Sequence, residues 1–327
     1  HGGVISAWGK PAAGMKSAKE VSEIAEQLEP LLTDSSLEKA EIAVVWSERA
    51  RGFFKTEPIE DLSYYDLIKD WTKLMRSAGN YFDIVEEISD LADYKLVYVP
   101  FCPAIDDPFF ERLEHFVRKG GVLVVGPLSG HRTVEHTVHV DAGLGRLEGL
   151  AGISESMSIP LTDSGMVGEA FGQKAPLGLW GMLLESPNGY QRGQVINEPF
   201  NGASFLLEHK LGKGILVNLS AMPVGSDGNK ILLKLFKHYL KVAEVTLSFE
   251  TTPGTIIIPR VKGDTRLWVV INMNGAGGTV ELSEMGKDLV SDCEIKAGSL
   301  QVEPYGYRLI ELDEISRLSL VHEEELP

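Results

Sequence analysis

The chain has 327 residues, of which 47 are Asp or Glu and 31 are Lys or Arg, so its formal charge is −16 at pH 7. An acidic excess on this scale repels nucleic-acid phosphates and anionic lipid surfaces, so neither nucleic acid nor a membrane is expected as a partner. The length exceeds that of one ordinary domain, and a hydrophobic share of 43% is enough to fill more than one buried core.

The sequence has neither an apolar run approaching the ~20 residues that span a bilayer nor a recognisable signal peptide, and we expect a cytoplasmic protein. The two cysteines, Cys102 and Cys293, fall in different predicted domains, which excludes a disulfide framework. The chain opens on His1-Gly2-Gly3 without an initiator methionine, so we expect that something is missing upstream.

Residues 1–14 are rich in Gly, Pro and Ala and are predicted to form a loop. Residues 17–32 carry apolar side chains at spacings of three and four, which predicts an amphipathic helix. Ser17, with Glu20 three residues later, is typical of a capping box at the start of that helix.

From residue 41 the pattern alternates between strand and helix. Short apolar runs predict strands at 41–46, 81–87, 95–100 and 122–126. Helical periodicity separates some of them, around 64–75 and over 108–118, and a further hairpin and helix follow at 203–221 and 229–242. This alternation predicts an α/β fold over residues 39–245, with a parallel sheet between two layers of helices.

The pattern changes again after Val245. Short alternating segments divided by Gly, Pro, Asn and Asp predict a small antiparallel β-sandwich over residues 246–313. Residues 314–327 end in Glu-Glu-Glu-Leu-Pro and are predicted to be a solvated acidic tail.

Two motifs invite a catalytic interpretation. Asn197-Glu198-Pro199 has the form of the acid/base segment of many retaining glycosidases. That chemistry needs a second carboxylate about 5 Å away on another barrel strand, and coincidence is the favoured explanation. Residues 126–130 follow a strand where a nucleophile elbow would lie, but the central position is Leu128, and Ser129 is one residue out of register.

Cys102, at the end of the third strand, is a candidate thiol. Its neighbours Phe101, Pro103 and Asp106 offer no cationic surroundings that would favour a thiolate. We therefore predict a buried structural cysteine.

Two further clusters also have simple structural explanations. The histidines at 131, 136 and 139 match no zinc-ligand spacing, so a solvated loop is expected. Gly212-Lys213-Gly214 lacks the remainder of a phosphate-binding loop and is predicted to be a hairpin turn. Accordingly, we predict no catalytic residue, no cofactor site and no metal site in this chain.

Aromatic residues gather in and after the loop that follows the first strand. That edge of an open α/β sheet is where ligands and partners usually bind, and a monomer would have difficulty burying so many rings in a loop. We predict an oligomer contact, or the rim of an active site in the intact protein, at Trp46, Phe53, Phe54, Tyr64 and Tyr65. Packing of Tyr64 and Tyr65 within their own helix is an equally good explanation for those two.

The order of these segments resembles the middle domain of the family 42 glycoside hydrolases, the β-galactosidases. The resemblance is carried by EIAVVWSERARGFF (41–54), YYDLIKDWTKLMRSAGNYFDIV (64–85) and DLADYKLVYVPFCPAIDDPFFERLEHFVRKGGVLVVGPLSG (90–130). The stretch from RLWVVINMN (266–274) to VEPYGYRLIEL (302–312) is similar to the C-terminal β domain of the family. Residues 82–130 are the most specific part.

The resemblance implies a flavodoxin-like, glutaminase-like domain that has no amidotransferase activity and forms a homotrimer. It also implies that residues 1–38 are a linker and helix leaving a catalytic barrel that would precede His1. Both catalytic glutamates of the family lie on strands of that barrel, so neither can be assigned to a residue here. The parent enzyme would hydrolyse terminal β-galactosides by a retaining two-glutamate mechanism.

The sequence leaves three functions open. The first is a non-catalytic oligomerisation and accessory region, inactive on its own. The second is a free-standing glutaminase-like enzyme, against which Leu128 at the elbow argues. The third is a carbohydrate-binding module, in which Trp268 could stack on a sugar, although Leu267 and Val269 equally suggest a core strand.

Overall fold

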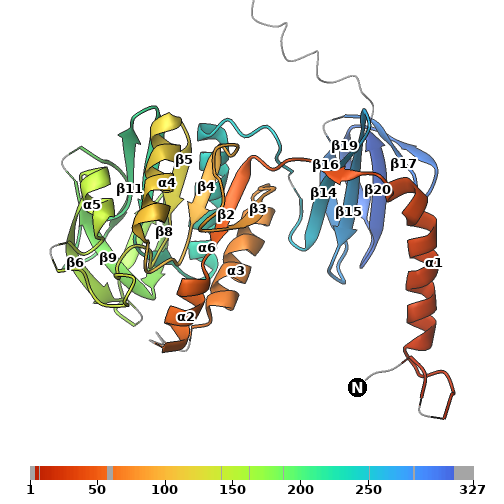
Figure 1. Ribbon diagram of the computed structural model, residues 1–327, viewed down its shortest axis with the longest axis horizontal. Coiled ribbons are helices and arrows are strands. Elements are labelled where there is room, and N and C mark those ends of the chain that lie inside the picture. Colours follow the sequence, from red (N-terminus) through yellow and green to blue (C-terminus); the bar gives the residue numbers. More distant parts are fainter. Residues whose placement is uncertain are drawn as a thin grey trace, which may run out of the picture. The chain divides into compact units, whose positions relative to one another are not determined.

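The structure is a computed structural model (Figure 1), and it describes residues 4–6, 8–56, 62–140, 142–161, 163–186, 188–249, 251–282 and 284–312. The chain forms two compact units. The larger unit is Ala40–Pro253, and the smaller unit combines His1–Lys39 with Gly254–Pro327. The acidic tail predicted for 314–327 lies outside the described residues.

The larger unit is built around five parallel strands, all within the α/β region predicted from sequence. In spatial order they are β3 (Asp83–Glu86), β2 (Ile42–Trp46), β4 (Leu96–Val99), β5 (Val122–Val125) and β12 (Gly214–Leu219). Every residue of β4 and β5 is buried. Such continuous burial requires apolar side chains on both faces of the sheet, and this explains the unbroken apolar runs.

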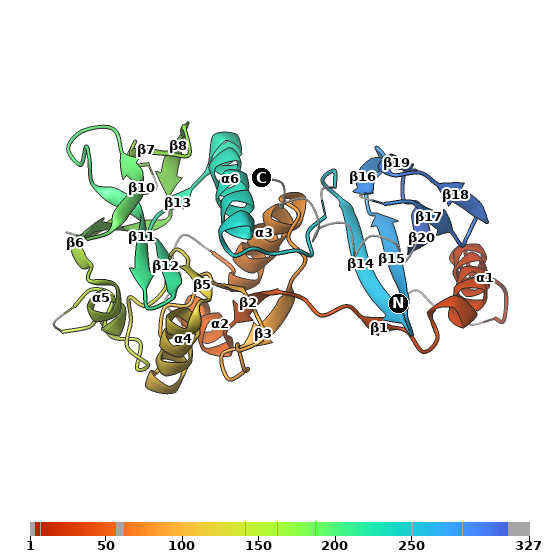
Figure 2. The ribbon, with the colours of Figure 1, turned by 90° about the horizontal axis from the view of Figure 1, so that it is seen from above.

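Alternate side chains of these strands enter two separate cores. Ile42 and Val44 face a core shared with α2 (Glu48–Thr56), α3 (Tyr64–Ser77) and α6 (Gly225–Val242). Ala43 and Val45 face the opposite core, which is shared with α4 (Asp107–Lys119) and α5 (Arg146–Ala151). Figure 2 shows α3 and α6 on one side of the strands and α4 and α5 on the other. The unit therefore has the three layers that the sequence predicted.

The sheet is mixed, and in this respect the prediction of a parallel sheet is incomplete. Beyond β12 the order continues antiparallel through β11 (Ser204–Leu211), β10 (Tyr190–Val195), β7 (Val167–Ala170), β8 (Gln173–Gly178) and β13 (Met222–Pro223). A pair formed by β6 (Ser154–Pro160) and β9 (Trp180–Glu185) joins β11. The region 127–195, irregular in sequence, therefore supplies most of the antiparallel half.

In the described residues of the smaller unit, antiparallel strands are accompanied by one helix, α1 (Met15–Leu32). One sheet has the order β1 (Ser36–Leu37), β14 (Thr255–Lys262), β15 (Thr265–Asn272), β20 (Tyr307–Leu312), β17 (Gly286–Asp288) and β18 (Cys293–Ile295). A second sheet pairs β16 (Gly278–Leu282) with β19 (Gly298–Val302). The pairing of β1 with β14 joins residues 36–37 to residues 260–261, which local sequence patterns did not predict.

Two local predictions are wrong. Helix α1 begins at Met15 after Gly14, and no side chain caps it, so Ser17 and Glu20 do not form a capping box at its start. Phe53 and Phe54 lie within helix α2 and not in a loop. The sequence around Ala50, Glu-Arg-Ala-Arg, is strongly charged, so the apolar face of this short helix was not recognisable from the sequence.

Candidate functional site

The carboxyl ends of the parallel strands are the first place to look for a functional site, because ligands of open α/β sheets bind there. Ser47 follows β2, Glu87 follows β3, Cys102 follows β4 and Ser129 follows β5. These residues lie close together at one edge of the sheet, and their polar groups bond to one another and to the backbone.

Ser129 connects the ends of two strands. Its hydroxyl accepts a hydrogen bond from the backbone N–H of Cys102 at 2.9 Å and donates one to the Val99 carbonyl at 2.9 Å. Leu128, the preceding residue, has a positive φ of 57°, a turn geometry that costs energy for a residue with a Cβ. A strained turn is therefore present at the elbow position, but no helix directly follows it in the described part of the chain, its central side chain is apolar, and its serine bonds to the backbone.

The prediction of a buried, structural Cys102 agrees with the structure. The side chain is 1% exposed, and its sulfur lies 3.5 Å from Oε1 of Glu87 and 3.5 Å from the Ala104 carbonyl. Burial, together with the negative charge of Glu87, raises the pKa of the thiol well above its ordinary value. A thiol held in its neutral form is a poor nucleophile.

The predicted aromatic residues are brought together, but mostly inside the domain. The rings of Trp46 and Tyr64 are 4.8 Å apart, Phe54 stacks on Tyr64 at 5.9 Å, and Phe53 contacts Phe54 at 5.5 Å. Phe53, Phe54 and Tyr64 are buried and Trp46 is half-buried. The expectation that a monomer would have difficulty burying these rings is therefore wrong for Phe53, Phe54 and Tyr64. The place of the five residues at an oligomer interface stays a prediction.

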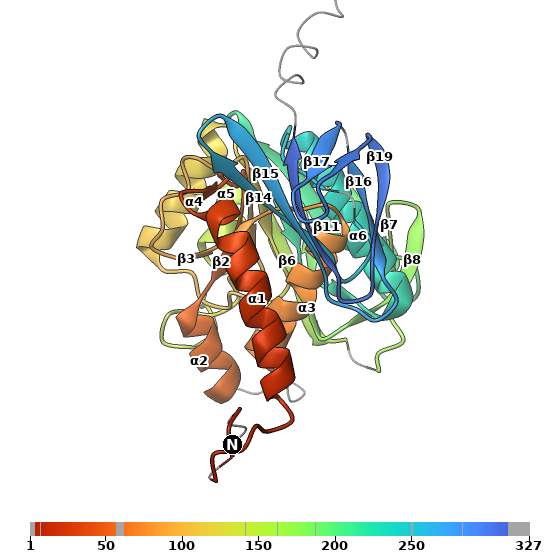
Figure 3. The same cartoon turned by 90° about the vertical axis from the view of Figure 1, so that its right-hand side faces the viewer.

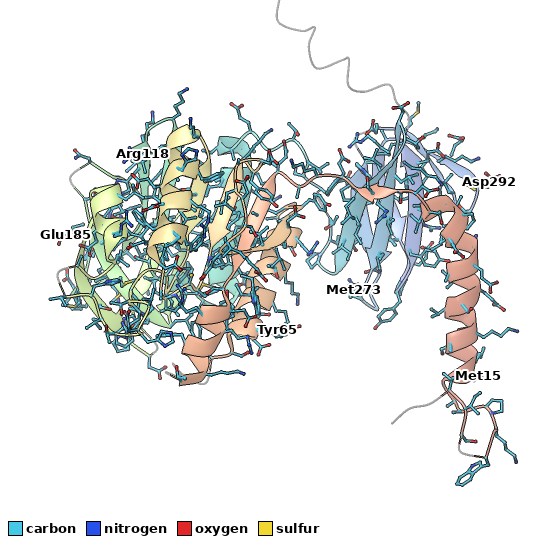
Figure 4. All side chains as sticks on the ribbon, in the orientation of Figure 1. Met15, Tyr65, Arg118, Glu185, Met273 and Asp292 are labelled. Carbon is cyan, nitrogen blue, oxygen red and sulfur yellow. The ribbon has the colours of Figure 1, made fainter. Side chains whose placement is uncertain are left out.

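Tyr64 and Tyr65 have opposite surroundings although they are adjacent. The Tyr64 hydroxyl accepts a 2.9 Å hydrogen bond from the backbone N–H of Ser47, and burial raises its pKa. Ser47 in turn uses its own hydroxyl to accept the N–H of Ala50 in the first turn of α2. Tyr65 is 63% exposed and lies at the outer surface of the unit (Figure 4).

The histidine cluster is divided by burial. His131 is buried, and its ring lies 5.9 Å from that of Phe53, which also contacts His136 at 5.3 Å. Burial, assisted by the positive charge of Arg132, lowers the pKa of His131 to about 3. The prediction of a solvated loop is therefore wrong for His131. Among the described residues no group of three or more His, Cys, Asp or Glu side chains is arranged to hold a metal ion.

The Asn-Glu-Pro triplet has a structural explanation. Asn197 accepts the backbone N–H of Val167 at 2.8 Å and donates to the Gly165 carbonyl at 3.0 Å. Both bonds hold the start of β7. Glu198 is exposed on the surface of this segment. The arrangement organises a loop and is not a paired-carboxylate site.

Sequence reasoning missed a charged pair between strands. Arg192 on β10 donates to both carboxylate oxygens of Glu208 on β11, at 2.9 and 3.2 Å, and the Tyr239 hydroxyl donates to the same group at 3.3 Å. The bond to Glu208, against the opposing effect of burial, raises the pKa of Arg192. The pairing required the position of β10, which the irregular sequence before residue 195 did not reveal.

Two other candidates are also structural. Trp268 on β15 is only 4% exposed, so a sugar cannot stack on it without rearrangement of the sheet. Gly212, with φ of 62°, forms the turn between β11 and β12, as predicted. No helix in the described part of the chain is long and apolar enough to cross a membrane.

Two protein families match the chain in tandem. Residues 40–246 match the β-galactosidase trimerisation domain, and residues 254–312 match the β-galactosidase C-terminal domain. β-Galactosidase YesZ of Bacillus subtilis (strain 168) is 37% identical over 313 residues, which are 96% of this chain and 47% of YesZ. YesZ of Bacillus licheniformis is 39% identical over 314 residues, with the same coverage.

Solved structures share the fold. The β-galactosidase from Bacillus circulans sp. alkalophilus superposes with a TM-score of 0.84 at 21% identity, over 96% of this chain and 47% of that one. The enzyme from Halorubrum lacusprofundi gives 0.80 at 21% identity, over 96% and 45%.

The chain belongs to the family 42 β-galactosidases, and it carries their trimerisation and C-terminal domains. It spans about half the length of the curated relatives it matches, and no catalytic barrel is present among the residues that the structure describes.

Proposed function

We propose that this chain is the non-catalytic oligomerisation and accessory region of a β-galactosidase. The observation that carries the proposal is the tandem match of residues 40–246 and 254–312 to two non-catalytic domains of one enzyme family. In support of the proposal, Cys102, Ser129 and Asn197 all serve packing and backbone bonding.

Helix α1 supports a partner outside the described residues. This helix, drawn in red and labelled in Figure 3, extends for 18 residues, and none of its residues is buried. Val21 is exposed, and Ile24 and Leu28 on the same apolar stripe are only half-buried. Burial of an apolar side chain gains roughly 1.5–3 kcal/mol, so the stripe favours contact with a further apolar surface. We assign that surface to the catalytic barrel of the intact protein.

The domain class, the oligomeric state and the mechanism proposed for the intact protein are inferred from membership of the family. The order of the parallel strands, with the first strand in the chain between the second and third, is that of flavodoxin-like sheets, which supports a glutaminase-like class for the domain. In the intact protein we propose a homotrimer that hydrolyses terminal β-galactosides by a retaining mechanism, with both glutamates on the barrel. A cytoplasmic location stays a prediction.

The other two functions receive less support. A free-standing glutaminase-like enzyme needs a nucleophile at the elbow, where Leu128 lies. A carbohydrate-binding module built on Trp268 needs an exposed indole, and this one is buried.

A chimera tests the proposal. The half of Bacillus subtilis YesZ that corresponds to this chain is replaced by residues 1–327, and both hydrolysis of nitrophenyl β-galactoside and solution mass are measured. We expect an assembled, active enzyme, whereas the chain without a barrel gives no turnover above background. A folded chimera that stays monomeric, or turnover by the chain alone that Glu198→Gln abolishes, would contradict the proposal.

A further inference from the structure

We propose that Asn188 is a site of spontaneous deamidation, at which reaction with water converts the side-chain amide to a carboxylate. The inference is independent of the function proposed above. Asn188 lies in the turn between β9 and β10, and Gly189 follows it directly. The turn begins after Glu185, which Figure 4 labels at the outer surface of the larger unit.

The reaction needs the backbone nitrogen of the residue that follows the asparagine. This nitrogen attacks Cγ of the side chain, so that an N–Cγ bond forms while the Cγ–Nδ2 bond breaks. The departing amide nitrogen takes up the backbone N–H proton and leaves as ammonia. Water then opens the cyclic imide at either of its carbonyls, which gives aspartate or isoaspartate. Water is the only co-reactant, and no atom changes its oxidation state.

Three asparagines of the chain precede a glycine: Asn188, Asn201 and Asn274. Glycine in the second position favours the attack, because it has no Cβ to hinder the approach and adopts backbone conformations that other residues avoid. Two structural requirements separate the three sites. The asparagine side chain must be free to rotate, and the glycine nitrogen must leave its hydrogen bond at little cost.

The side chain of Asn274 is not free to rotate. Its Oδ1 accepts the backbone N–H of Ala276 at 2.8 Å, and its own N–H donates to Oδ1 of Asn272 at 3.2 Å. Its carbonyl accepts the backbone N–H of Tyr305 at 3.1 Å. Rotation of the amide toward Gly275 breaks the first of these bonds, so the attack is hindered at this site.

At Asn201 the glycine is held instead. Asn201 itself is exposed, but the N–H of Gly202 donates to the carbonyl of Val195 on β10 at 2.8 Å. The Gly202 carbonyl also accepts a hydrogen bond from Nε2 of Gln191 at 2.9 Å. The nitrogen that must attack is therefore fixed to a carbonyl of the sheet.

Asn188 meets both requirements. The residue is exposed, and none of the hydrogen bonds found in the described part of the chain involves its side chain. The N–H of Gly189 donates to a side-chain oxygen, Oγ of Ser186, at 3.0 Å. The same oxygen also accepts the N–H of Asn188 at 3.4 Å, which is long for a hydrogen bond. A shared serine hydroxyl on a turn releases the Gly189 nitrogen more easily than a strand carbonyl releases that of Gly202.

The packing beneath the turn keeps the second residue a glycine. A Cβ on Gly189 would lie 2.9 Å from Nε2 of His209 on β11, closer than such atoms approach. His209 is 5% exposed, so its ring has little room to move aside. The fold therefore imposes on an exposed turn the dipeptide that deamidates most readily.

The test follows deamidation of the full chain during incubation at neutral pH. Samples taken over time are digested, and mass spectrometry of the peptides gives the extent of conversion at each of the three Asn-Gly pairs. We expect Asn188 to convert about tenfold faster than Asn201 or Asn274, because breaking a retained hydrogen bond adds to the activation free energy at those two sites. In urea the three rates should become similar, since the dipeptide is the same.

Two variants provide a second readout. Asn188→Gln lengthens the side chain and makes ring closure unfavourable, so ion-exchange chromatography should no longer resolve the acidic species that accumulates in the wild type. Asn201→Gln is the matched control and should still form it, and circular dichroism verifies that both fold. Native conversion at Asn188 that is no faster than at Asn201 or Asn274, or an unchanged acidic species in Asn188→Gln, would overturn the proposal.

Discussion

The hydroxyl oxygen of Ser129 lies 2.9 Å from the backbone nitrogen of Cys102 and accepts its hydrogen bond. In hydrolases built on such a sheet this edge supplies a nucleophile. Here the Ser129 hydroxyl bonds to the backbone of Cys102, the Cys102 thiol contacts Glu87 and the Ala104 carbonyl, and both residues are buried. The hydroxyl of Ser129 therefore joins the ends of β4 and β5.

The first prediction concerns that bond. Ser129→Ala leaves the buried N–H of Cys102 without its acceptor, while the Val99 carbonyl keeps the hydrogen bond from the Gly126 N–H. We therefore expect a loss of about 1–3 kcal/mol in the free energy of unfolding. Urea denaturation measures it, and Ser299→Ala, on an exposed residue of β19, is the control. Equal midpoints for the two variants would show that the bond contributes nothing.

The two cysteines form a built-in comparison for thiol reactivity. Cys293 is exposed and Cys102 is buried, and the raised pKa of the Cys102 thiol further reduces its reactivity. A thiol reagent at neutral pH is therefore expected to modify one cysteine rapidly in the native protein, and both in denaturant. Rapid native labelling of a Cys293→Ser variant would contradict a structural Cys102.

Tyr64 and Tyr65 allow a matched pair of substitutions. Tyr64→Phe removes the acceptor for the buried N–H of Ser47, with an expected cost of about 1–3 kcal/mol in unfolding free energy. Tyr65→Phe changes an exposed hydroxyl, and its effect should stay within about 0.5 kcal/mol. Thermal or urea unfolding of both variants gives the comparison; equal effects would contradict the assignment of Tyr64 to the core.

The contrast between these tyrosines shows what sequence patterns can and cannot provide. Apolar periodicity predicted the helix that begins at Tyr64, and short apolar runs predicted the four strands from β2 to β5, because both signals are local in the sequence. It did not predict helix α2, which is short and rich in charge. Because that helix was missed, the burial of Phe53 and Phe54 was missed too, and their place at an oligomer contact stays a prediction.

The rest of the fold could not be predicted from sequence, because it depends on strand pairing between residues that are far apart in the chain. The strands β6 to β10 are short and interrupted by Gly and Pro, and their order depends on contacts with β11 that local sequence does not encode. The joining of Ser36 and Leu37 to β14 is similar, because its two strands are more than 200 residues apart.

His131 makes the stability of the fold depend on pH. Its pKa is about 3 in the folded chain and about 6.5 in an unfolded one. Between those values the unfolded state binds more protons than the folded state, so the free energy of unfolding falls as the pH is lowered. The slope due to this one histidine approaches about 1.4 kcal/mol per pH unit.

Unfolding in urea from pH 4 to 7 measures this dependence. His131→Gln should flatten the slope, while His115→Gln, on an exposed residue of α4, should keep the slope of the wild type. An unchanged slope in His131→Gln would mean that the imidazole reaches water in the folded state.

The central claim is that this chain assembles copies of an enzyme without containing its catalytic machinery, and the mass of the purified chain in solution tests it most directly. Sedimentation equilibrium over a concentration series is the measurement. With a single-chain mass of 35.8 kDa, three copies amount to roughly 107 kDa, the mass expected for the cyclic trimer. A mass of 35.8 kDa at every concentration would contradict the account.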